Sequence, residues 1–490
     1  MILQQLLAAL PGAVAHGPVD VPVTGLALDS RRVSGGHVFF ALAGVKADGA
    51  RFAEAAVAAG AVAVVGAAGS GVPGATHVEV AEPRLALAQA ACAWNGDPSR
   101  ALKLVAVTGT NGKTTTTWLL ESIFDAASWS AGVIGTTGVR IAGESRPSAF
   151  TTPESPDLQS LLAEMRARGV TAVAMEASSH ALAQRRTWGL ACDAAVFTNL
   201  TQDHLDYHGT MEAYLDAKLM LFDGRNGGAA KPCAAVLNAD DPAADRVAVA
   251  ARRGGMRLVR FGAAPNGDVR LASVEPRPGG MWLHLAVPGA AGLDVQLPML
   301  GRFNAWNAAG AFAAALALGV DGATAANGLE NFRGVPGRLE RVAAGQDFTV
   351  AVDYAHTPDA LERALDACRE HTRGRLLCVF GCGGDRDRGK RPLMGAIAAR
   401  LADRAWVTND NPRSEPPAAI AAGIVAGAPD GGLVTILDRR DAIAAALSEA
   451  RTGDIVLVAG KGHETTQTIG ADVLPFDDRA VTRELLGGGR

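Results

Sequence analysis

The sequence predicts an α/β protein of three domains. A small N-terminal α/β domain precedes a central domain with a mostly parallel sheet and helices on both faces, and a C-terminal Rossmann-like α/β domain follows. Two observations carry this prediction. The chain has 490 residues, enough for roughly three domains of about 150 residues each. Short apolar runs also alternate with helical stretches along most of the chain, which is typical of parallel sheets covered by helices.

Two segments rich in turn-forming residues divide the chain. The run Asn95-Gly-Asp-Pro-Ser precedes a strongly apolar stretch, and Phe332-Arg-Gly-Val-Pro-Gly-Arg precedes another α/β pattern. We therefore place domain boundaries near residues 97 and 335, giving domains 1–97, 98–335 and 336–490. Predicted strands lie at 38–42 and 61–65 in the first domain, at 170–175 and 194–198 in the second, and at 348–352, 376–380, 404–408 and 455–459 in the third.

Composition restricts the classes of partner. Hydrophobic residues make up 48% of the chain, charged residues 20%, and the formal net charge is -4. This balance excludes long-range disorder and gives no reason to expect nucleic acid or anionic lipid as a partner, so small-molecule partners are expected. Six scattered cysteines form no C-x-x-C pair. No signal-peptide core and no apolar run long enough to span a membrane are apparent, so we expect a cytoplasmic protein.

The strongest local motif follows the apolar run 104–107. A Gly-containing turn leads into a helix that begins with a cation, which predicts a phosphate-binding loop and a P-loop-type central sheet. Gly109 and Gly112 would let backbone N–H groups approach phosphate oxygens, Lys113 would supply a point charge, and the Thr114 hydroxyl would ligate Mg²⁺. The strict motif fails because Val107 stands where its first glycine belongs, and a plain turn is the alternative.

Two polar clusters follow the predicted strands of the central domain. Glu176 comes directly after the first strand, which places it at the mouth of the sheet as a candidate Mg²⁺ ligand, with helix capping as the alternative. The segment 198–209 follows the second strand and contains two His and two Asp residues. His204, nearer the strand end, is a candidate for metal or phosphate chemistry, whereas His208 also fits a solvated loop histidine.

Several long motifs occur together along the chain. They are Thr108-Gly-Thr-Asn-Gly-Lys-Thr, Met175-Glu-Ala-Ser-Ser-His, Gly301-Arg-Phe-Asn-Ala-Trp-Asn, Pro336-Gly-Arg-Leu-Glu, Asp353-Tyr-Ala-His-Thr-Pro and Gly381-Cys-Gly-Gly-Asp-Arg-Asp. Through them the chain resembles the Mur ligases, ATP-dependent enzymes that form the amide bonds of the peptidoglycan stem peptide. The resemblance implies that a carboxylate attacks the γ-phosphate of ATP to give an acyl phosphate, from which an amine displaces phosphate.

The resemblance also assigns residues to ATP and Mg²⁺. ATP would contact Thr108, Gly109, Thr110, Asn111, Gly112, Lys113, Thr114, Thr115, Asn304, Arg338, Asp353 and His356. Thr114 and Glu176 would hold one Mg²⁺, while His204 and a carbamylated Lys218 would hold a second, and Lys113, Glu176, His204 and Lys218 would be catalytic. From the residues alone, Lys218 fits a surface helix lysine. Asn304 and Asp353 also fit turn or capping residues.

The acid substrate has two expected binding segments. Leu28 and Ser30 would contact the UDP moiety of the substrate, although Asp29-Ser-Arg also fits an ordinary capped turn. The muramoyl dipeptide would contact Thr151, Thr152, Ser178, Gln184 and Arg186. A guanidinium near the D-glutamate is chemically sensible, and the neighbouring Arg185 leaves the register open by one residue.

The amine substrate is indicated by Asp410-Asn411-Pro412-Arg413. This motif resembles that of the family members that add meso-diaminopimelate, and lysine-adding members lack its arginine. Arg413 would pair with the second carboxylate of diaminopimelate. The remaining positions for this amino acid are Arg386, Gly460 and Glu464, with Glu464 suited to the distal ammonium. A plain Asn-Pro turn is the alternative for the motif.

The resemblance therefore implies addition of meso-2,6-diaminopimelate to the D-glutamate of UDP-N-acetylmuramoyl-L-alanyl-D-glutamate, by a monomer. The nearest competing interpretations are the lysine-adding ligase and a folylpolyglutamate synthase. A different class is a P-loop switch or motor that hydrolyses ATP without the sugar nucleotide. A NAD-dependent enzyme is excluded, because the Gly-rich segment 381–385 lacks G-x-G-x-x-G spacing.

Overall fold

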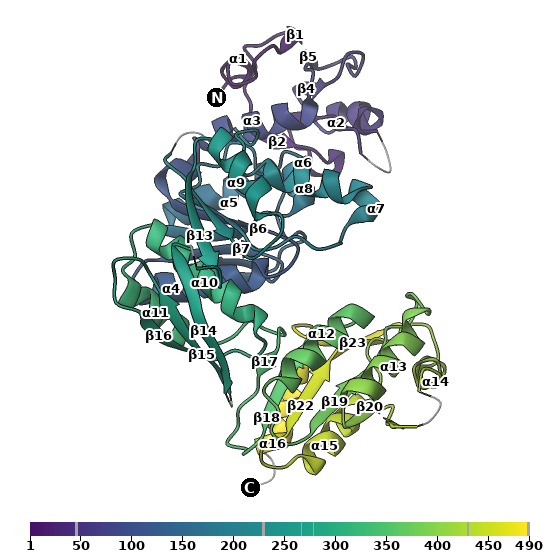
Figure 1. The fold of residues 1–490 in the computed structure, drawn as a ribbon. Coiled ribbons are helices and arrows are strands. Elements are labelled where there is room, and N and C mark those ends of the chain that lie inside the picture. The colour runs from purple at the N-terminus through teal and green to yellow at the C-terminus, as the bar shows by residue number, and fades with distance from the viewer. Residues whose placement is uncertain (45–47, 228–230, 266, 278, 429–430, 488–490) are drawn as a thin grey trace. The chain divides into compact units, whose positions relative to one another are not determined.

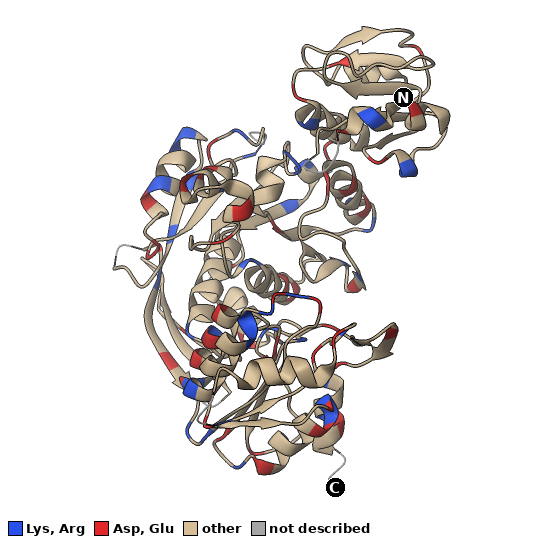
Figure 2. Ribbon diagram, turned by 90° about the vertical axis from the view of Figure 1, so that its right-hand side faces the viewer, with Lys and Arg blue, Asp and Glu red and all other residues tan. Residues whose placement is uncertain are grey.

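The computed structural model describes the whole chain except residues 45–47, 228–230, 266, 278, 429–430 and 488–490 (Figure 1). Its residues form two compact units. Unit 1 comprises residues 1–268 and 310–325, and unit 2 comprises residues 269–309 and 326–490. Within the described residues, no helix combines the length and apolar composition needed to cross a bilayer. Acidic and basic residues are interspersed along the ribbon (Figure 2), in keeping with the small net charge of -4.

The N-terminal part of unit 1 is a small mixed sheet with the strand order β1-β5-β4-β3-β2. The strands are β1 (Val14–His16), β2 (Gly25–Ala27), β3 (His37–Phe40), β4 (Ala63–Gly66) and β5 (Thr76–Glu79). Strand β1 runs antiparallel to β5, whereas β2, β3, β4 and β5 run parallel to one another. The helices are α1 (Leu3–Leu7), α2 (Ala53–Ala58) and α3 (Pro83–Asn95). Strand β3 packs Phe39 into one buried cluster and Phe40 into another, because successive side chains point to opposite faces.

The turn-rich segment after α3 is packed rather than extended. Gly96 and Asp97 end the helix with left-handed φ values of 68° and 48°, and the 3₁₀ turn η3 (Pro98–Ala101) follows. Ser99 is completely buried and its Oγ accepts a hydrogen bond from Ala191 N at 3.0 Å. Helix α3 also packs against α5 (Ser155–Ala167). The chain therefore passes into the central sheet without a break in packing.

The central sheet in unit 1 has the strand order β9-β8-β7-β10-β6-β11-β12-β13. Its strands are β6 (Lys103–Thr108), β7 (Ala131–Gly135), β8 (Gly138–Ile141), β9 (Glu144–Arg146), β10 (Ala172–Glu176), β11 (Ala194–Phe197), β12 (Ala234–Asn238) and β13 (Arg257–Gly262). Strands β7, β10, β6, β11, β12 and β13 are parallel. The remaining helices are α4 (Lys113–Ala126), α6 (Ser179–Ala183), α7 (Leu205–His208), α8 (Met211–Leu219) and α9 (Ala244–Arg253).

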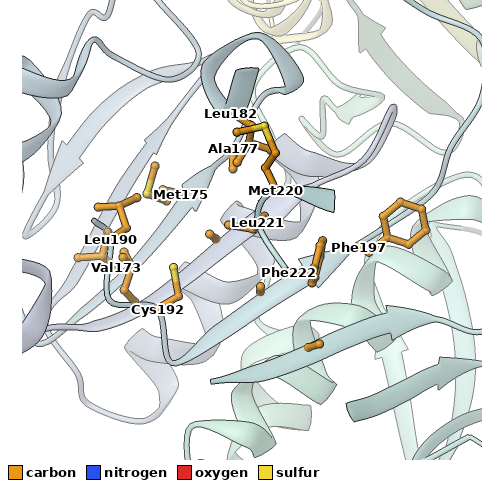
Figure 3. Packing of buried hydrophobic residues seen from close by; sticks show 14 of the residues in the cluster. Val173, Met175, Ala177, Leu182, Leu190, Cys192, Phe197, Met220, Leu221 and Phe222 are labelled. Atoms are coloured by element: carbon orange, nitrogen blue, oxygen red, sulfur yellow. The ribbon is translucent and has the colours of Figure 1, made fainter. Parts of the chain in front are cut away.

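Parallel strands covered by helices are buried on both faces, which explains their nearly continuous apolar sequences. Every residue of β10 and β11 is buried. Figure 3 shows side chains of this core, where Val173 and Met175 of β10 lie near Cys192 and Leu190, and Leu182 lies near Met220. Because β6, β10 and β11 run parallel, their C-terminal ends meet at one edge of the sheet, where the predicted polar residues follow.

Unit 2 contains an antiparallel meander and a second parallel sheet. The meander is β14 (Val269–Arg277), β15 (Gly280–Ala286) and β16 (Leu293–Leu297). The sheet has the order β17-β18-β22-β19-β20-β21, with β17 (Glu340–Arg341), β18 (Thr349–Asp353), β19 (Leu376–Phe380), β20 (Arg404–Val407), β21 (Leu433–Thr435) and β22 (Ile455–Ala459). Strands β23 (Thr466–Ile469) and β24 (Asp472–Pro475) form a hairpin. The four strands predicted in this region occur within one residue of the expected bounds.

Helices line both faces of this second sheet. They are α12 (Pro358–Arg369), α13 (Lys390–Leu401), α14 (Pro417–Val425), α15 (Arg439–Glu449) and α16 (Asp478–Gly487). Two separate apolar clusters, one with α12, α13 and α14 and one with α15 and α16, pack against alternate side chains of its strands. Helices α10 (Phe303–Ala317) and α11 (Gly322–Glu330) have residues in both units. The predicted α/β class with mostly parallel sheets is confirmed.

Candidate active site

The predicted phosphate-binding loop connects β6 to the first turn of α4. Gly109 has a φ of 146°, and a Cβ built there would lie 1.9 Å from Thr198 Oγ1. Only glycine fits this position, because an L side chain would be both strained and in collision. Gly112 has a φ of 85° directly before the helix. Lys113 Nζ donates to the backbone oxygens of Gly109 at 3.0 Å and Thr110 at 2.8 Å, so its ammonium lies over the loop.

The loop is supported by two residues at the end of β11 that sequence reasoning missed. Thr198 Oγ1 donates to Asn111 O at 2.6 Å. Asn199 Oδ1 accepts from Asn111 N at 2.9 Å, and its Nδ2 donates to Asn111 O at 3.2 Å. Their place directly after a buried strand parallel to β6 is the signal that could have identified them.

Glu176, the last residue of β10, lies beside this loop as expected. Its carboxylate is buried, with 1% of the residue exposed. Oε1 accepts from Thr114 Oγ1 at 2.9 Å and from Thr136 N at 2.8 Å, while Oε2 accepts from Thr136 Oγ1 at 3.2 Å. A Cβ at Gly135 would come within 2.3 Å of Oε1, so this glycine makes room for the carboxylate. The capping alternative does not describe these contacts, which run to a turn and to Thr114.

A carboxylate beside a threonine hydroxyl is a donor set that suits Mg²⁺, which prefers oxygen ligands and usually takes further oxygens from substrate phosphates and water. The described residues contain no group of three or more His, Cys, Asp or Glu side chains arranged to hold a metal by themselves. The protein oxygens at this edge therefore fit a magnesium ion that a nucleotide brings with it.

Lys218 on α8 is buried against the same loop. It is 1% exposed, its Nζ donates to Gly109 O at 2.8 Å, and it lies 4.2 Å from the ring centroid of Tyr214. Burial, and secondarily the charge of Lys113, hold the pKa of Lys218 well below its usual 10.5. The interpretation of Lys218 as a surface helix lysine is therefore wrong. The position that the family resemblance singled out is a desolvated amine at the phosphate loop.

Histidine residues lie near Tyr214, whose ring also contacts Lys218. His204 has a left-handed φ of 53°, and its ring centroid is 4.8 Å from that of His180. Its Nε2 is 3.4 Å from Asp203 Oδ2, and its side chain is 44% exposed. His208 is partly buried, and its Nε2 is 3.0 Å from Ser179 Oγ. His208 is thus a hydrogen-bonded residue of the cluster and not a solvated loop histidine.

Four of the five residues expected to bind the dipeptide are joined by hydrogen bonds. Arg186 Nη1 donates to Thr152 O at 3.1 Å, and its Nε donates to Gln184 Oε1 at 3.1 Å. Thr152 Oγ1 accepts from Ser178 N at 3.1 Å. The fifth residue, Thr151, has its hydroxyl 3.0 Å from that of Thr136, which itself bonds Glu176.

The neighbouring arginine points elsewhere. Arg185 has a left-handed φ of 59° and lies 3.7 Å from Glu82. Arg186 is therefore the member of the cluster.

Glu154 and Arg84 extend this cluster and were not anticipated. Glu154 Oε1 lies 3.0 Å from Arg186 Nη2, and its Oε2 lies 3.4 Å from Arg84 Nη1. The side chains of Glu154 and Arg186 are only 11% and 12% exposed. One carboxylate thus serves two guanidinium groups, and burial lowers the pKa of Arg186. Because the guanidinium groups outnumber the carboxylate, this arrangement favours binding of an anionic group.

The segment with Leu28 and Ser30 forms an ordinary capped turn. Asp29 caps the turn η1 (Ser30–Arg32) by accepting from Arg31 N at 3.0 Å. The Arg31 guanidinium, more than the backbone contact, lowers the pKa of Asp29 to about 2. Leu28 packs against the N-terminal core, and Ser30 is partly buried. Among the described contacts, no hydrogen bond joins Leu28 or Ser30 to the cluster around Arg186.

The nucleotide residues expected in unit 2 are engaged locally. Asn304 Nδ2 donates to Leu300 O at 2.8 Å, and its Oδ1 accepts from Asn307 at 2.9 Å. Asp353 accepts from Leu339 N at 2.7 Å and Ala355 N at 2.8 Å, and burial raises its pKa. Both therefore make the turn and capping contacts that were the alternative.

Two other expected nucleotide residues flank a tyrosine. Arg338 lies 5.4 Å from the ring centroid of Tyr354. His356 Nδ1 is 2.8 Å from Tyr354 O. Their side chains thus lie together near the C-terminal end of β18.

The residues expected to bind the amine substrate come from loops at the C-terminal ends of β19, β20 and β22. Asn411 Nδ2 donates to Glu464 Oε2 at 2.9 Å. A Cβ at Gly460, whose φ is 121°, would lie 2.9 Å from Asp410 Oδ2. Asp410 is buried, which raises its pKa. These residues form one cluster, although Asn411 and Glu464 are 53 positions apart in the sequence.

The rest of the motif faces the loop after β19. Arg413 has a left-handed φ of 53°, and its Nη1 donates to Gly384 O at 2.7 Å. A Cβ at Gly384 would lie 1.8 Å from Pro412 O, so the two loops touch through their backbones. Arg386 is exposed in the same loop. A plain Asn-Pro turn does not account for this two-loop arrangement.

An ion pair beneath this cluster was also missed. Arg439, at the start of α15, pairs with Asp478 at the start of α16 through two bonds of 2.7 Å, and both side chains are 0% exposed. Arg439 also donates to Asn409 O at 3.2 Å and Ala459 O at 3.0 Å. It therefore fixes the ends of β20 and β22 from which the amine-site loops depart.

Comparison with known proteins gives consistent matches along the chain. Three family models match: "Mur ligase family, catalytic domain" at residues 22–99, "Mur ligase middle domain" at 107–315, and "Mur ligase, glutamate ligase domain" at 337–462. A UDP-N-acetylmuramoyl-L-alanyl-D-glutamate–2,6-diaminopimelate ligase of Geobacillus thermodenitrificans is 47% identical over 487 residues, covering 99% of each chain. One of Caulobacter vibrioides is 46% identical over 96% of each chain.

Solved structures of related proteins also match the chain. One of a UDP-N-acetylmuramoyl-L-alanyl-D-glutamate–2,6-diaminopimelate ligase has a TM-score of 0.78 at 35% identity, covering 99% of this chain and 98% of that one. A folylpolyglutamate synthase of Mycobacterium tuberculosis, complexed with ADP and AMPPCP, has a TM-score of 0.60 at 20% identity, covering 82% of this chain and 95% of that one. At that identity, the second match shows the shared fold alone.

Proposed function

The chain belongs to the Mur ligase family, and we propose that it joins meso-2,6-diaminopimelate to the D-glutamate of UDP-N-acetylmuramoyl-L-alanyl-D-glutamate, converting ATP to ADP and phosphate. The observation that carries the proposal is the near full-length identity to enzymes with this name, at 47% over 99% of the chain. The cluster of Asn411, Glu464 and Asp410 beside Arg413 supports the choice of amine.

ATP would bind with its phosphates in the loop 108–115. The backbone N–H groups of this loop and Lys113 would neutralise charge on the phosphates as the substrate carboxylate attacks the γ-phosphorus. Thr114 and Glu176 would hold a Mg²⁺ ion, which supplies Lewis-acid stabilisation of the phosphate oxygens. Asn304, Arg338, Asp353 and His356 are also proposed to contact the nucleotide.

Lys218 is proposed to become a carbamate. Its low pKa favours the neutral amine, whose nitrogen can bond to the carbon of CO₂ with release of one proton. The product is a carboxylate on a lysine stem, which together with His204 would be a ligand set for a second Mg²⁺. The ammonium itself cannot ligate a cation, so the modification is needed for this role.

The two substrates would enter separate clusters. We propose that Arg186, with Thr151, Thr152, Ser178 and Gln184, binds the dipeptide, and that Leu28 and Ser30 contact the UDP moiety. The amine substrate would meet Asp410 to Arg413, Arg386, Gly460 and Glu464. Arg413 would pair with the distal carboxylate of diaminopimelate, and a substrate lacking that group would leave the guanidinium without its partner.

The domain boundaries near 97 and 335 also stand as a proposal. They lie close to gaps between the family models, which end at 99 and resume at 107, and end at 315 and resume at 337. We further infer a cytoplasmic monomer that binds no nucleic acid. Six free thiols and a substrate pair of ATP and a nucleotide sugar suit a reducing compartment.

The experiment is phosphate release from ATP in the presence of the UDP-muramoyl dipeptide, with meso-diaminopimelate, L-lysine or no amino acid in parallel. Release only with diaminopimelate is expected. Release with lysine would retain the ligase and refute the assignment of Arg413. Equal release in all three reactions, or release without the sugar nucleotide, would instead indicate a nucleotide switch.

A further inference from the structure

Lys461 follows β22 and is completely buried, with 0% of its side chain exposed. Its Nζ donates to Asn411 Oδ1 at 3.3 Å and to Glu464 Oε2 at 3.2 Å. Because Asn411 Nδ2 also donates to Glu464 Oε2 at 2.9 Å, the three side chains form a closed triangle. Two of the three corners are residues assigned above to the amine substrate, and the third has no assigned role.

The burial of this ammonium needs a reason. A desolvated charge is unfavourable unless its partners compensate for the lost water, and an apolar side chain of similar size would fill the same space without that penalty. Both described partners of the ammonium are side chains of the proposed substrate site. The charge is therefore placed where it acts on those side chains.

The two carboxylate oxygens of Glu464 have different surroundings. Both hydrogen bonds described for it use Oε2, and its side chain remains 33% exposed although Lys461 is fully covered. Asn411 is fixed in the same way, since its Oδ1 accepts from Lys461 and from Thr468 N at 3.0 Å. With Oε2 bound inward, Oε1 is the atom left to meet a ligand.

Resting on the proposed function, we propose that Lys461 is a positioning residue for the amine substrate. It fixes Glu464 Oε2 and Asn411 Oδ1, so that Glu464 Oε1 is preoriented to accept a hydrogen bond from an ammonium group. No part of the substrate touches Lys461 in this arrangement. Its effect passes through Glu464 and Asn411 alone.

The surrounding charges favour a cationic ligand. Arg439 pairs with Asp478 and also acts through its charge on Asp410, while Lys461 donates a hydrogen bond to Glu464 and acts through its charge on Asp410. Two buried cations, Arg439 and Lys461, thus face three carboxylates, those of Asp410, Glu464 and Asp478. An entering ammonium adds the positive charge that this cluster accommodates.

The test compares steady-state constants of Lys461→Met with wild type, varying each substrate in turn. We expect KM for diaminopimelate to rise at least about tenfold, the loss of one hydrogen bond from a charged group. KM for ATP and for the UDP-muramoyl dipeptide should stay within about twofold. Lys231→Met is the matched control, because Lys231 is a mostly buried lysine, 17% exposed, paired with Asp193 at 3.0 Å in unit 1. It should leave KM for diaminopimelate unchanged.

A double-mutant cycle separates positioning from general damage. In a Glu464→Gln background, Lys461→Gln should raise KM for diaminopimelate much less than it does in wild type, because the carboxylate that Lys461 orients is already gone. This pair leaves neither charge buried, so it also serves if Lys461→Met fails to fold. Equal effects in both backgrounds, or parallel rises in all three KM values, would overturn the proposal.

The same measurements distinguish failure of the proposed function from failure of the role proposed for Lys461. If wild type uses L-lysine rather than diaminopimelate, the same cycle is measured with lysine, whose distal ammonium is the group in question. Wild type that releases phosphate without any amino acid would overturn the function and this inference together. Wild type with the expected specificity and an unchanged Lys461 variant would overturn the inference alone.

Discussion

Replacing Lys218 should have opposite effects on stability and on activity. We predict that Lys218→Met raises the unfolding temperature of the nucleotide-free protein while abolishing ligation. The wild-type ammonium is 1% exposed and has Gly109 O as its described acceptor, with the Tyr214 ring 4.2 Å away. No carboxylate hydrogen-bonds to it among the described contacts, so a methionine of similar length removes a poorly compensated charge.

The magnitude follows from three contributions. Desolvation of the ammonium costs about 5 kcal/mol. Its hydrogen bond returns about 2 kcal/mol, and the contact with Tyr214 about 1 kcal/mol. The balance is a penalty of about 2 kcal/mol in wild type, which Lys218→Met relieves. A cooperative unit of about 150–250 residues shifts its unfolding temperature by about 2–4 °C per kcal/mol. Relief of about 2 kcal/mol should therefore raise it by about 4–8 °C.

The pH dependence identifies the cause. Burial lowers the pKa of Lys218 below 10.5, so the unfolded chain binds the proton more tightly than the folded chain. The penalty is complete below the folded-state pKa, shrinks as the pH rises from there toward 10.5, and disappears above it. The advantage of Lys218→Met should therefore be largest below the folded-state pKa of Lys218 and shrink as the pH rises toward 10.5.

The assay is differential scanning calorimetry of both proteins across this pH range, in CO₂-depleted buffer so that the amine stays unmodified. Lys231→Met is the control, because Lys231 has Asp193 as an ion-pair partner and its loss should lower the unfolding temperature. The reasoning is refuted if Lys218→Met behaves like this control at the lowest pH at which both proteins are folded, or if its advantage does not change with pH.

Four further variants test other parts of the site. Lys113→Ala should abolish phosphate release without lowering the unfolding temperature, and measurable turnover would contradict its role. Arg413→Ala should raise KM for diaminopimelate and reduce its preference over L-lysine by about 10- to 100-fold; unchanged selectivity would disprove the pairing. Gly109→Ala combines backbone strain of about 1–3 kcal/mol with a Cβ 1.9 Å from Thr198 Oγ1, so calorimetric titration should show ATP binding at least about tenfold weaker. Glu154→Gln should weaken binding of the UDP-muramoyl dipeptide and so raise its KM, because Arg186 loses its carboxylate partner at 3.0 Å. An equal rise in KM for ATP would argue against a local effect.

The phosphate loop and Glu176 were predictable from local patterns, because an apolar strand followed by polar residues places those residues at the C-terminal edge of a parallel sheet. The burial of Lys218 was not. It depends on contact with Gly109, 109 positions earlier in the chain, and nothing in the helix around Lys218 indicates which face will meet the loop. Thr198 and Asn199 were missed for a related reason, since their role is to hold a loop supplied by another strand.

Asn304 and Asp353 show a different limit. A short polar side chain next to a helix or strand end can bond its own backbone or a ligand, and the local sequence is the same in both cases. Here the side chains bond Leu300 O and the N–H groups of Leu339 and Ala355. A contact with nucleotide must therefore use their remaining hydrogen-bonding capacity.

The two proposed substrate clusters have opposite electrostatic designs. Around Glu154, one carboxylate serves two guanidinium groups, Arg84 and Arg186. Around Lys461, two cations, Lys461 and Arg439, face three carboxylates, those of Asp410, Glu464 and Asp478. The first arrangement favours an incoming acid and the second an incoming amine, which are the two groups that a ligase joins. The net charge of -4 conceals both, because each local imbalance arises only when residues far apart in the sequence are brought together.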